Sequence, residues 1–268
     1  MLTREEKRER EKNKNFFFDF VKIQNHFFRD FVQQLKRVND NRHQSYITYG
    51  TEVILYTILL KNVFGIKSMR RMTEQLNKDE CIENIRNVLG LEELHELPHF
   101  DTINDFLSKL DPRELEKINI YMIKKLFDKR CFESYRIQNK YWPIIVDGTG
   151  IHTFKEKHCE HCLRREYKDK ETGETKVIYM HHVLEAKLVF GNMVFSIGTE
   201  FIENESENVS KQDCELKAFQ RLAAKIKNTF KRLPICLLGD SLYACESVFE
   251  LCDKNNWKYI FRFKEGRI

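Results

Sequence analysis

The chain has 268 residues, of which 41% are hydrophobic, and 46 lysines and arginines outnumber 41 aspartates and glutamates for a formal net charge of +5. This length allows one or two domains, and the mildly basic balance suits a polyanionic partner without requiring one. The charged N-terminal segment excludes a secretory signal, and the longest apolar run, Val53–Leu60, is too short to cross a bilayer, so we expect a cytoplasmic protein with reduced cysteines and no membrane partner.

Residues 1–135 are expected to form an all-helical region. Apolar side chains recur there at three- and four-residue steps, which places them on one face of a helix: Phe16, Phe20, Ile23, Phe27, Phe31 and Leu35. The segment Val53–Val63 is apolar almost all round and predicts a buried helix. Further along, Asp111 and Pro112 mark a helix start, and Glu114 completes a capping box. We interpret this region as a DNA-binding lead-in to a second domain.

A basic stretch within the helical region offers a possible DNA contact. Lys61–Arg71 carries four basic residues and no acid, and the helical segment Met72–Leu76 follows. This could be half of a helix-turn-helix-like unit. Ordinary helix packing explains the stretch equally well, because no turn signature is present.

Residues 136–268 are expected to form an α/β domain with a mixed sheet. The predicted order is a short strand Trp142–Val146, an insert at about 152–180, two strands joined by Gly191-Asn192, a helix started by Ser210 and Asp213, and then further elements. Those elements are strand Ile235–Leu238, a helix over Leu242–Cys252 and strand Trp257–Phe263. This alternation of strands and helices is typical of an α/β layer.

Two aspartates follow the predicted strands of this domain, Asp147 in the segment IIVDGTG and Asp240 in LLGDSLYA. Open α/β sheets place their sites at carboxyl ends of strands, and a divalent cation compensates buried carboxylates well. Each acid also has a modest interpretation, since Asp147-Gly148 is a common turn pair and Asp240 could cap the following helix. The occurrence of both beside the basic run Lys211–Arg232 favours metal binding.

The segment from Tyr141 to Phe263 resembles the ribonuclease H-like core of the insertion-sequence DDE transposases. The first acid of that family follows a strand in a D-G-T/S context, as Asp147 does, and the second follows a strand in a D-S/A-x-Y/F context, as Asp240 does. The segments PHFDTINDFLSKL and DPRELEKI resemble the helices that precede the catalytic core. With these lead-in helices, the resemblance extends over roughly Phe16 to Phe263.

The resemblance implies a DNA transposase that performs metal-dependent phosphoryl transfer, first cleaving element ends and then joining them to target DNA. Asp147 and Asp240 would bind Mg²⁺ or Mn²⁺, with double-stranded DNA as the partner, a homodimer in the synaptic complex and a location in the cytoplasm at the nucleoid. The third acid of the family, a glutamate on a helix well downstream, has no counterpart before Ile268. We therefore expect a C-terminally truncated transposase whose isolated chain is inactive or weakly active.

Two alternatives to an active transposase remain open. One is a non-catalytic DNA-binding protein, acting as a transposition inhibitor or surviving as a decayed remnant. The other is a host exonuclease with a ribonuclease H-like fold. Against the exonuclease, Asp147-Gly148-Thr149 lacks the nearby second acid of a D-x-E motif.

The expected insert holds a second constellation, Cys159 and Cys162 in a C-x-x-C pair. Such a pair is the usual half of a tetrahedral zinc site, with further ligands available from His152, His158 or the pair His181-His182. Reduced surface cysteines, a redox pair and a mobile DNA-contacting arm are the competing interpretations.

Two aromatic residues flank Asp240 in sequence, Tyr243 and Trp257. Either could stack on a base, but aromatic residues in such positions commonly pack a sheet. We expect packing for Trp257, and the sequence leaves the role of Tyr243 open.

Overall fold

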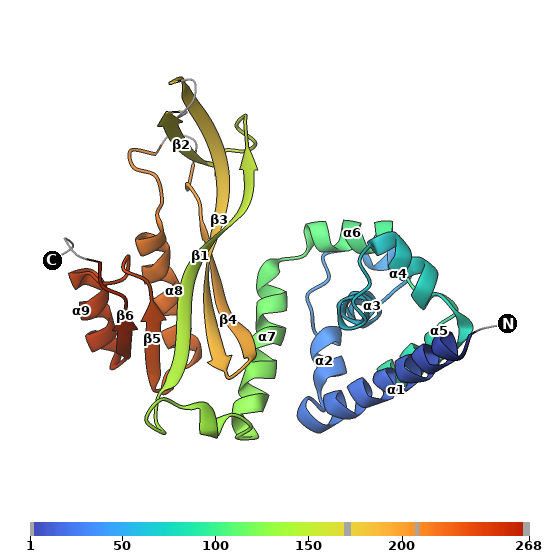
Figure 1. The fold of residues 1–268 in the computed structure, drawn as a ribbon. Helices are drawn as coiled ribbons and strands as arrows, with labels where there is room; N and C mark the ends of the chain where they lie inside the picture. The colour runs from blue at the N-terminus through green and yellow to red at the C-terminus, as the bar shows by residue number, and fades with distance from the viewer. Residues whose placement is uncertain (1–2, 169–172, 207–208, 265–268) are drawn as a thin grey trace. The chain divides into compact units, whose positions relative to one another are not determined.

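The computed structural model describes residues 3–168, 173–206 and 209–264, and the chain divides into two compact units, residues 1–129 and residues 130–268. The first unit is all-helical and the second combines a sheet with helices (Figure 1). Within the described residues, no helix combines the length and the apolar character that crossing a bilayer requires.

The helices of the first unit are α1 (Arg4–Phe27), α2 (Phe31–Lys36), α3 (Thr51–Val63), α4 (Met69–Leu76), α5 (Asp79–Leu89), α6 (Phe100–Lys109) and α7 (Pro112–Asp128), with a 3₁₀ turn at Gln44–Tyr46. The predicted stripe from Phe16 to Leu35 is interrupted, because the chain leaves the helical conformation between α1 and α2. The prediction of a buried helix at α3 is confirmed, since seven of its residues are buried.

The core of the helical unit combines apolar packing with one buried polar pair. Tyr56 and Gln24 are both buried, and the Tyr56 hydroxyl donates to Oε1 of Gln24 at 3.0 Å. Because an unpaired buried polar group is costly, this bond fixes α1 against α3. Burial also raises the pKa of the Tyr56 hydroxyl.

The start of α7 was predicted correctly, but its capping box was not. Oδ1 of Asp111 accepts a hydrogen bond from the amide of Arg113 at 2.9 Å, and Pro112 occupies the first turn. The carboxylate of Glu114 instead accepts from the distant amide of Asn39 at 3.3 Å. A tertiary partner has therefore replaced the local one.

The second unit is built on a six-stranded mixed sheet. Its strands are β1 (Trp142–Phe154), β2 (Leu163–Lys168), β3 (Thr175–Phe190), β4 (Met193–Ile202), β5 (Ile235–Gly239) and β6 (Lys258–Phe261), with a 3₁₀ turn at Glu133–Tyr135 before them. The order is β2-β3-β1-β5-β6, and β4 also pairs with β3. The pairs β1·β5 and β5·β6 are parallel, whereas β1·β3, β2·β3 and β3·β4 are antiparallel. This mixed sheet with its helices, preceded by the helical unit, confirms the expected α/β class of the second unit.

Two helices accompany the sheet, α8 (Glu215–Thr229) and α9 (Glu246–Asn255). Helix α8 packs on β3 and β4, where a Cβ added at Gly198 would lie 2.9 Å from the side chain of Leu222 (Figure 1). The alternating residues Leu184, Ala186 and Leu188 of β3 are all buried. These contacts bury one face of the sheet, which is the driving force for this layer.

The predicted and observed strands differ most at β1. The predicted strand Trp142–Val146 is longer in the structure, because β1 continues through Asp147 and Gly148 to Phe154 and pairs with β3, with a register shift between Gly150 and His152. The alternative interpretation of Asp147-Gly148 as a strand-ending turn is therefore wrong. The insert expected at about 152–180 contains the end of β1, all of β2 and the first residues of β3. The hairpin at Gly191-Asn192 is confirmed, and Gly191 has the positive φ of 60° that such a loop requires.

The two helix starts predicted in this unit are also displaced. Helix α8 begins at Glu215 without a side-chain cap, and Asp213 instead accepts hydrogen bonds from the amides of Glu203 and Cys214. Helix α9 begins at Glu246, so Asp240 does not cap it. Oδ1 of Asp240 accepts from the amide of Leu242 at 2.7 Å within the preceding turn.

Candidate active site

The two predicted metal-binding aspartates follow paired residues of the neighbouring parallel strands β1 and β5, with Asp147 inside β1 and Asp240 directly after the end of β5. Ile145 of β1 is the register partner of Leu238 of β5. Asp147 and Asp240 each follow two residues later, and neighbouring strands lie about 4.8 Å apart. Both residues are exposed to solvent. The sheet therefore brings together two acids that are far apart in sequence.

A third acid lies beside Asp147 on its other side. Glu185 of β3 is the antiparallel register partner of Asp147, so the two side chains share one face of the sheet. Acids in such positions repel each other, and Nζ of Lys187 lies 2.6 Å from Oε2 of Glu185. Asp147 thus sits between acidic neighbours, where a cation would be favoured.

Glu215, the first residue of α8, is an acid of this region that the sequence analysis did not single out. A Cβ added at Gly148 would lie 2.5 Å from Oε2 of Glu215, so the glycine makes room for this carboxylate. Oε1 of Glu215 accepts a hydrogen bond of 2.5 Å from the hydroxyl of Tyr243. No local sequence signal identifies Glu215, since its place depends on how α8 packs over β1.

The hydroxyl of Tyr243 lies close enough to Glu215, Asp147 and Asp240 to respond to the negative charge of all three acids. Burial raises the pKa of its hydroxyl well above the usual range, and the hydrogen bond to Glu215 and the negative charges of Glu215, Asp147 and Asp240 raise it further. The side chain is 1% exposed and stacks on Phe261. Tyr243 is therefore a buried, protonated donor, which resolves the role that the sequence left open, and Trp257 is buried as expected.

The arrangement can bind a divalent cation through carboxylate oxygens. Mg²⁺ uses one or two carboxylates and completes its octahedron with water and substrate phosphate oxygens. Asp147 and Asp240 have this chemistry and the required exposure. However, the carboxylate oxygens of Asp147, Asp240 and Glu215 do not all lie within 4.8 Å of one another. Among the described residues, these three acids therefore do not form a preformed three-ligand site.

The predicted cysteine pair lies elsewhere, where β2 begins. Sγ of Cys159 lies 3.7 Å from Sγ of Cys162, and Nε2 of His181 lies 3.5 Å and 3.4 Å from these two sulfurs. In the part of the chain that the structure describes, this is the one group of three metal-ligand residues with ligand atoms all within 4.8 Å. Of the four histidines that the sequence offered, His181 joins the cysteines, while the His158 ring stacks on Phe154.

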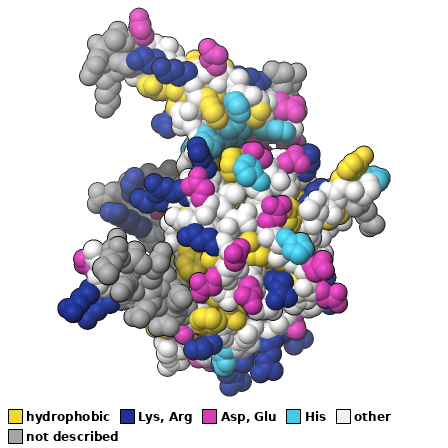
Figure 2. Space-filling model, turned by 90° about the vertical axis from the view of Figure 1, so that its right-hand side faces the viewer, with side chains coloured by type: hydrophobic (Ala, Val, Ile, Leu, Met, Phe, Trp, Pro, Cys, Tyr) yellow, Lys and Arg dark blue, Asp and Glu magenta, His cyan; other side chains and the backbone are white. Residues whose placement is uncertain are grey.

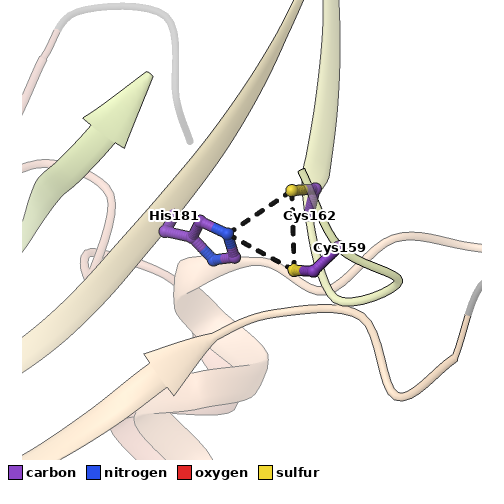
Figure 3. Close-up of side chains that lie close together, drawn as sticks. All are labelled: Cys159, Cys162 and His181. Carbon is purple, nitrogen blue, oxygen red and sulfur yellow. Dashed lines mark hydrogen bonds between the residues drawn. The ribbon is translucent and has the colours of Figure 1, made fainter. Parts of the chain in front are cut away.

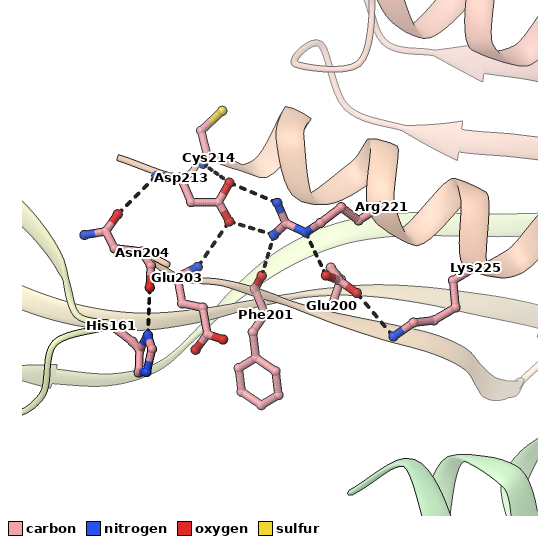
Figure 4. A network of polar contacts seen from close by, with 9 residues as sticks. All are labelled: His161, Glu200, Phe201, Glu203, Asn204, Asp213, Cys214, Arg221 and Lys225. Carbon is pink, nitrogen blue, oxygen red and sulfur yellow. Dashed lines mark hydrogen bonds and ion pairs between the residues drawn. The ribbon is translucent and has the colours of Figure 1, made fainter. Parts of the chain in front are cut away.

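The basic run before Asp240 is partly engaged within the protein. Arg221 of α8 forms ion pairs with Asp213 at 2.7 Å and Glu200 at 2.7 Å, and Lys225 lies 3.2 Å from Glu200 (Figure 4). Hydrogen bonds from Arg221 and the backbone outweigh burial and lower the pKa of Asp213. Because Arg221 and Lys225 are held in these ion pairs, the run is not simply a positive surface for DNA. On the face drawn in Figure 2, basic and acidic side chains are also interspersed.

A comparison with family models finds a match, which lies in the helical unit. Residues 32–122, about a third of the chain, match the family model DDE_Tnp_1-associated. They run from α2 into α7 and include the short α3–α4 connection. No curated protein sequence matches the chain.

Solved structures with distant similarity include two transposases. A piggyBac transposase in a synaptic complex with hairpin DNA is 11% identical with a TM-score of 0.36, and the match covers 91% of this chain and 50% of that one. The Mos1 strand transfer complex is 14% identical with a TM-score of 0.27, covering 82% and 60%. The chain thus spans about half to three fifths of the length of these proteins.

Proposed function

We propose that this chain, which belongs to the DDE transposase family through the domain at residues 32–122, is an insertion-sequence transposase that uses Asp147 and Asp240 for metal-dependent phosphoryl transfer on DNA. The observation that carries the proposal is the register of β1 and β5, which brings these two acids to adjacent positions. The family assignment comes from the helical unit and the acids lie in the sheet unit, so the two lines of support are independent.

The acids suit Mg²⁺ or Mn²⁺ by the chemistry of their donors. Exposed carboxylates are hard oxygen ligands, and a third acid, Glu185, adds negative charge on the same face of the sheet as Asp147. A bound divalent ion would polarise the scissile phosphate and activate the attacking hydroxyl. The aspartates would hold the ion, and the turn hydrogen bond from Leu242 would orient Asp240.

Glu215 and Tyr243 would position the site rather than bind the substrate directly. The buried Tyr243 hydroxyl holds the Glu215 carboxylate beside Gly148, next to Asp147 in the chain. In this position Glu215 adds negative charge close to the first aspartate and increases the attraction for a cation. This role is distinct from that of the third acid of the family, for which we nominate no residue.

DNA is the proposed partner, held by the helical unit. Ser68 caps α4 by accepting a hydrogen bond from the amide of Arg71, and the basic residues Lys67, Arg70 and Arg71 lie at or just before the start of that helix. Backbone amides and cations at a helix start are suited to phosphate contact. We further propose that two copies of the chain act together, one at each element end.

A plasmid cleavage assay tests the proposal. Supercoiled DNA carrying the encoding element with its flanks is incubated with the chain and Mg²⁺ or Mn²⁺, alongside Asp147→Asn and Asp240→Asn. Because no residue is nominated for the third acid of the family, we expect only weak strand breaks at the element ends, which both substitutions abolish. DNA binding without cleavage would support the alternative of a non-catalytic inhibitor or remnant, and cleavage that survives both substitutions would contradict the proposed site.

A further inference from the structure

We propose that Cys159, Cys162 and His181 form a structural Zn²⁺ site, separate from the acidic site and independent of the proposed function. The three side chains come from the loop after β1, the residue before β2, and β3, and their ligand atoms point toward one another (Figure 3). Two thiolates and an imidazole are soft and borderline ligands that select zinc over magnesium.

The distances match a tetrahedral zinc ion. With Zn–S near 2.3 Å and Zn–N near 2.0–2.1 Å, a regular tetrahedron separates two sulfurs by about 3.8 Å and sulfur from nitrogen by about 3.6 Å. The corresponding separations here are 3.7 Å between the sulfurs and 3.5 Å and 3.4 Å from Nε2 of His181. Three corners of a tetrahedron are thus already in place.

The backbone holds the ligands in this arrangement. Leu163 pairs with Met180, so the preceding Cys162 lies opposite His181 on the neighbouring strand. The amide of Cys162 donates to the carbonyl of Cys159 at 3.4 Å and closes the turn between the cysteines. The Phe154 ring contacts the His181 ring edge-on, with centroids 5.8 Å apart, and restricts its orientation.

One buried residue, Asn204, connects this loop to the start of α8. Its Nδ2 donates to the carbonyl of Cys162 at 3.0 Å, and its carbonyl accepts from Nδ1 of His161 at 2.8 Å. Its Oδ1 accepts from the amide of Asp213 at 3.2 Å (Figure 4). A metal that fixes the Cys159–Cys162 turn therefore also supports the segment that leads into α8 and Glu215.

The site has the character of a structural element. Cys162 is 3% exposed, and the loop between β1 and β2, residues 155–162, contains no aliphatic residue and no phenylalanine. In such a segment a bound ion replaces the hydrophobic packing that would otherwise fix the chain. We infer that zinc holds the β1–β2 connection against β3.

The test is the metal content of the full-length chain purified without chelators. We expect about one zinc per chain by elemental analysis, and its loss in Cys162→Ser and His181→Ala. Matched controls are Cys131→Ser, an exposed thiol, and His158→Ala, whose ring lies against Phe154. Both controls should retain zinc, and Co²⁺ in its place should show thiolate charge-transfer absorption.

A second measurement uses the wild-type chain, so its result does not depend on whether the variants fold. Hydrogen exchange of the wild-type chain, before and after zinc removal by a chelator, should show faster exchange in residues 155–163 and unchanged exchange in α3. Absence of zinc with free thiols, a Cys159–Cys162 disulfide in the purified chain, or equal zinc loss in the controls would overturn the proposal.

Discussion

The hydroxyl of Tyr243 lies 2.5 Å from Oε1 of Glu215, and this hydrogen bond joins the turn after β5 to the first residue of α8. Tyr243 is buried near three acids, and burial, the hydrogen bond to Glu215 and these negative charges raise the pKa of its hydroxyl and keep it protonated. The bond therefore fixes a carboxylate beside the strand that carries Asp147, and it explains why a buried tyrosine rather than a phenylalanine occupies this position.

Replacing Tyr243 by phenylalanine should lower stability, because Glu215 loses its donor. Hydrogen bonds to charged groups contribute about 1.5–3 kcal/mol, and we expect a loss of that order in urea unfolding at pH 7. Tyr259→Phe is the control, since Tyr259 is 39% exposed. An equal loss in both variants would contradict the assigned role.

The same substitution should change the alkaline stability profile. The folded pKa of Tyr243 is raised, so its contribution is complete below the unfolded pKa of 10.0 and is lost as pH rises above it toward the folded value. The stability difference between wild type and Tyr243→Phe should therefore shrink above pH 10. A difference that grows with pH would show that the tyrosine is not held in its neutral form.

Gly148→Ala should disturb the acidic site through Glu215. The new Cβ would lie 2.5 Å from Oε2 of Glu215, whose flexible side chain must move and strain its hydrogen bond with Tyr243. We expect a loss of unfolding free energy no larger than the roughly 1.5–3 kcal/mol expected for Tyr243→Phe, while Mn²⁺ affinity falls about tenfold. Gly150→Ala is the matched control, because its Cβ meets His182 at an ordinary 3.4 Å. Equal losses of Mn²⁺ affinity in the two variants would refute a specific role for Glu215.

Asp213→Asn should weaken the network around the start of α8. The ion pair with Arg221 is partly exposed, so we expect a loss of about 1 kcal/mol at neutral pH. The pKa of Asp213 is lowered, so its contribution is complete above the ordinary value of 3.8 and disappears as pH falls through the folded value. Urea unfolding should show a smaller difference between the two chains at pH 3 than at pH 7, and a constant difference would contradict this assignment.

Local signals predicted much of the fold correctly. The Gly191-Asn192 hairpin, the buried helix α3 and the Asp111 cap of α7 depend on neighbouring residues, and the structure confirms them. The Glu114 capping box failed because Asn39, a distant residue, took its place. Local rules succeed where no tertiary partner competes.

The site required information that only long-range pairing provides. The extension of β1 beyond Asp147 results from its pairing with β3, which overrides the turn preference of Asp-Gly. The choice of His181 as the partner of Cys162 likewise follows from the β2–β3 register. Glu215 reaches the site only because α8 packs over the sheet, so no sequence motif announced it.

The most direct test of the account is a double-mutant cycle of Mn²⁺ binding, measured by electron paramagnetic resonance on the zinc-loaded chain. Asp147→Asn and Asp240→Asn should each weaken binding at least about tenfold, and the double variant should be little weaker than either single variant, because both acids bind one ion. Unchanged Mn²⁺ affinity in either single variant, or independent and additive losses, would contradict a shared metal site.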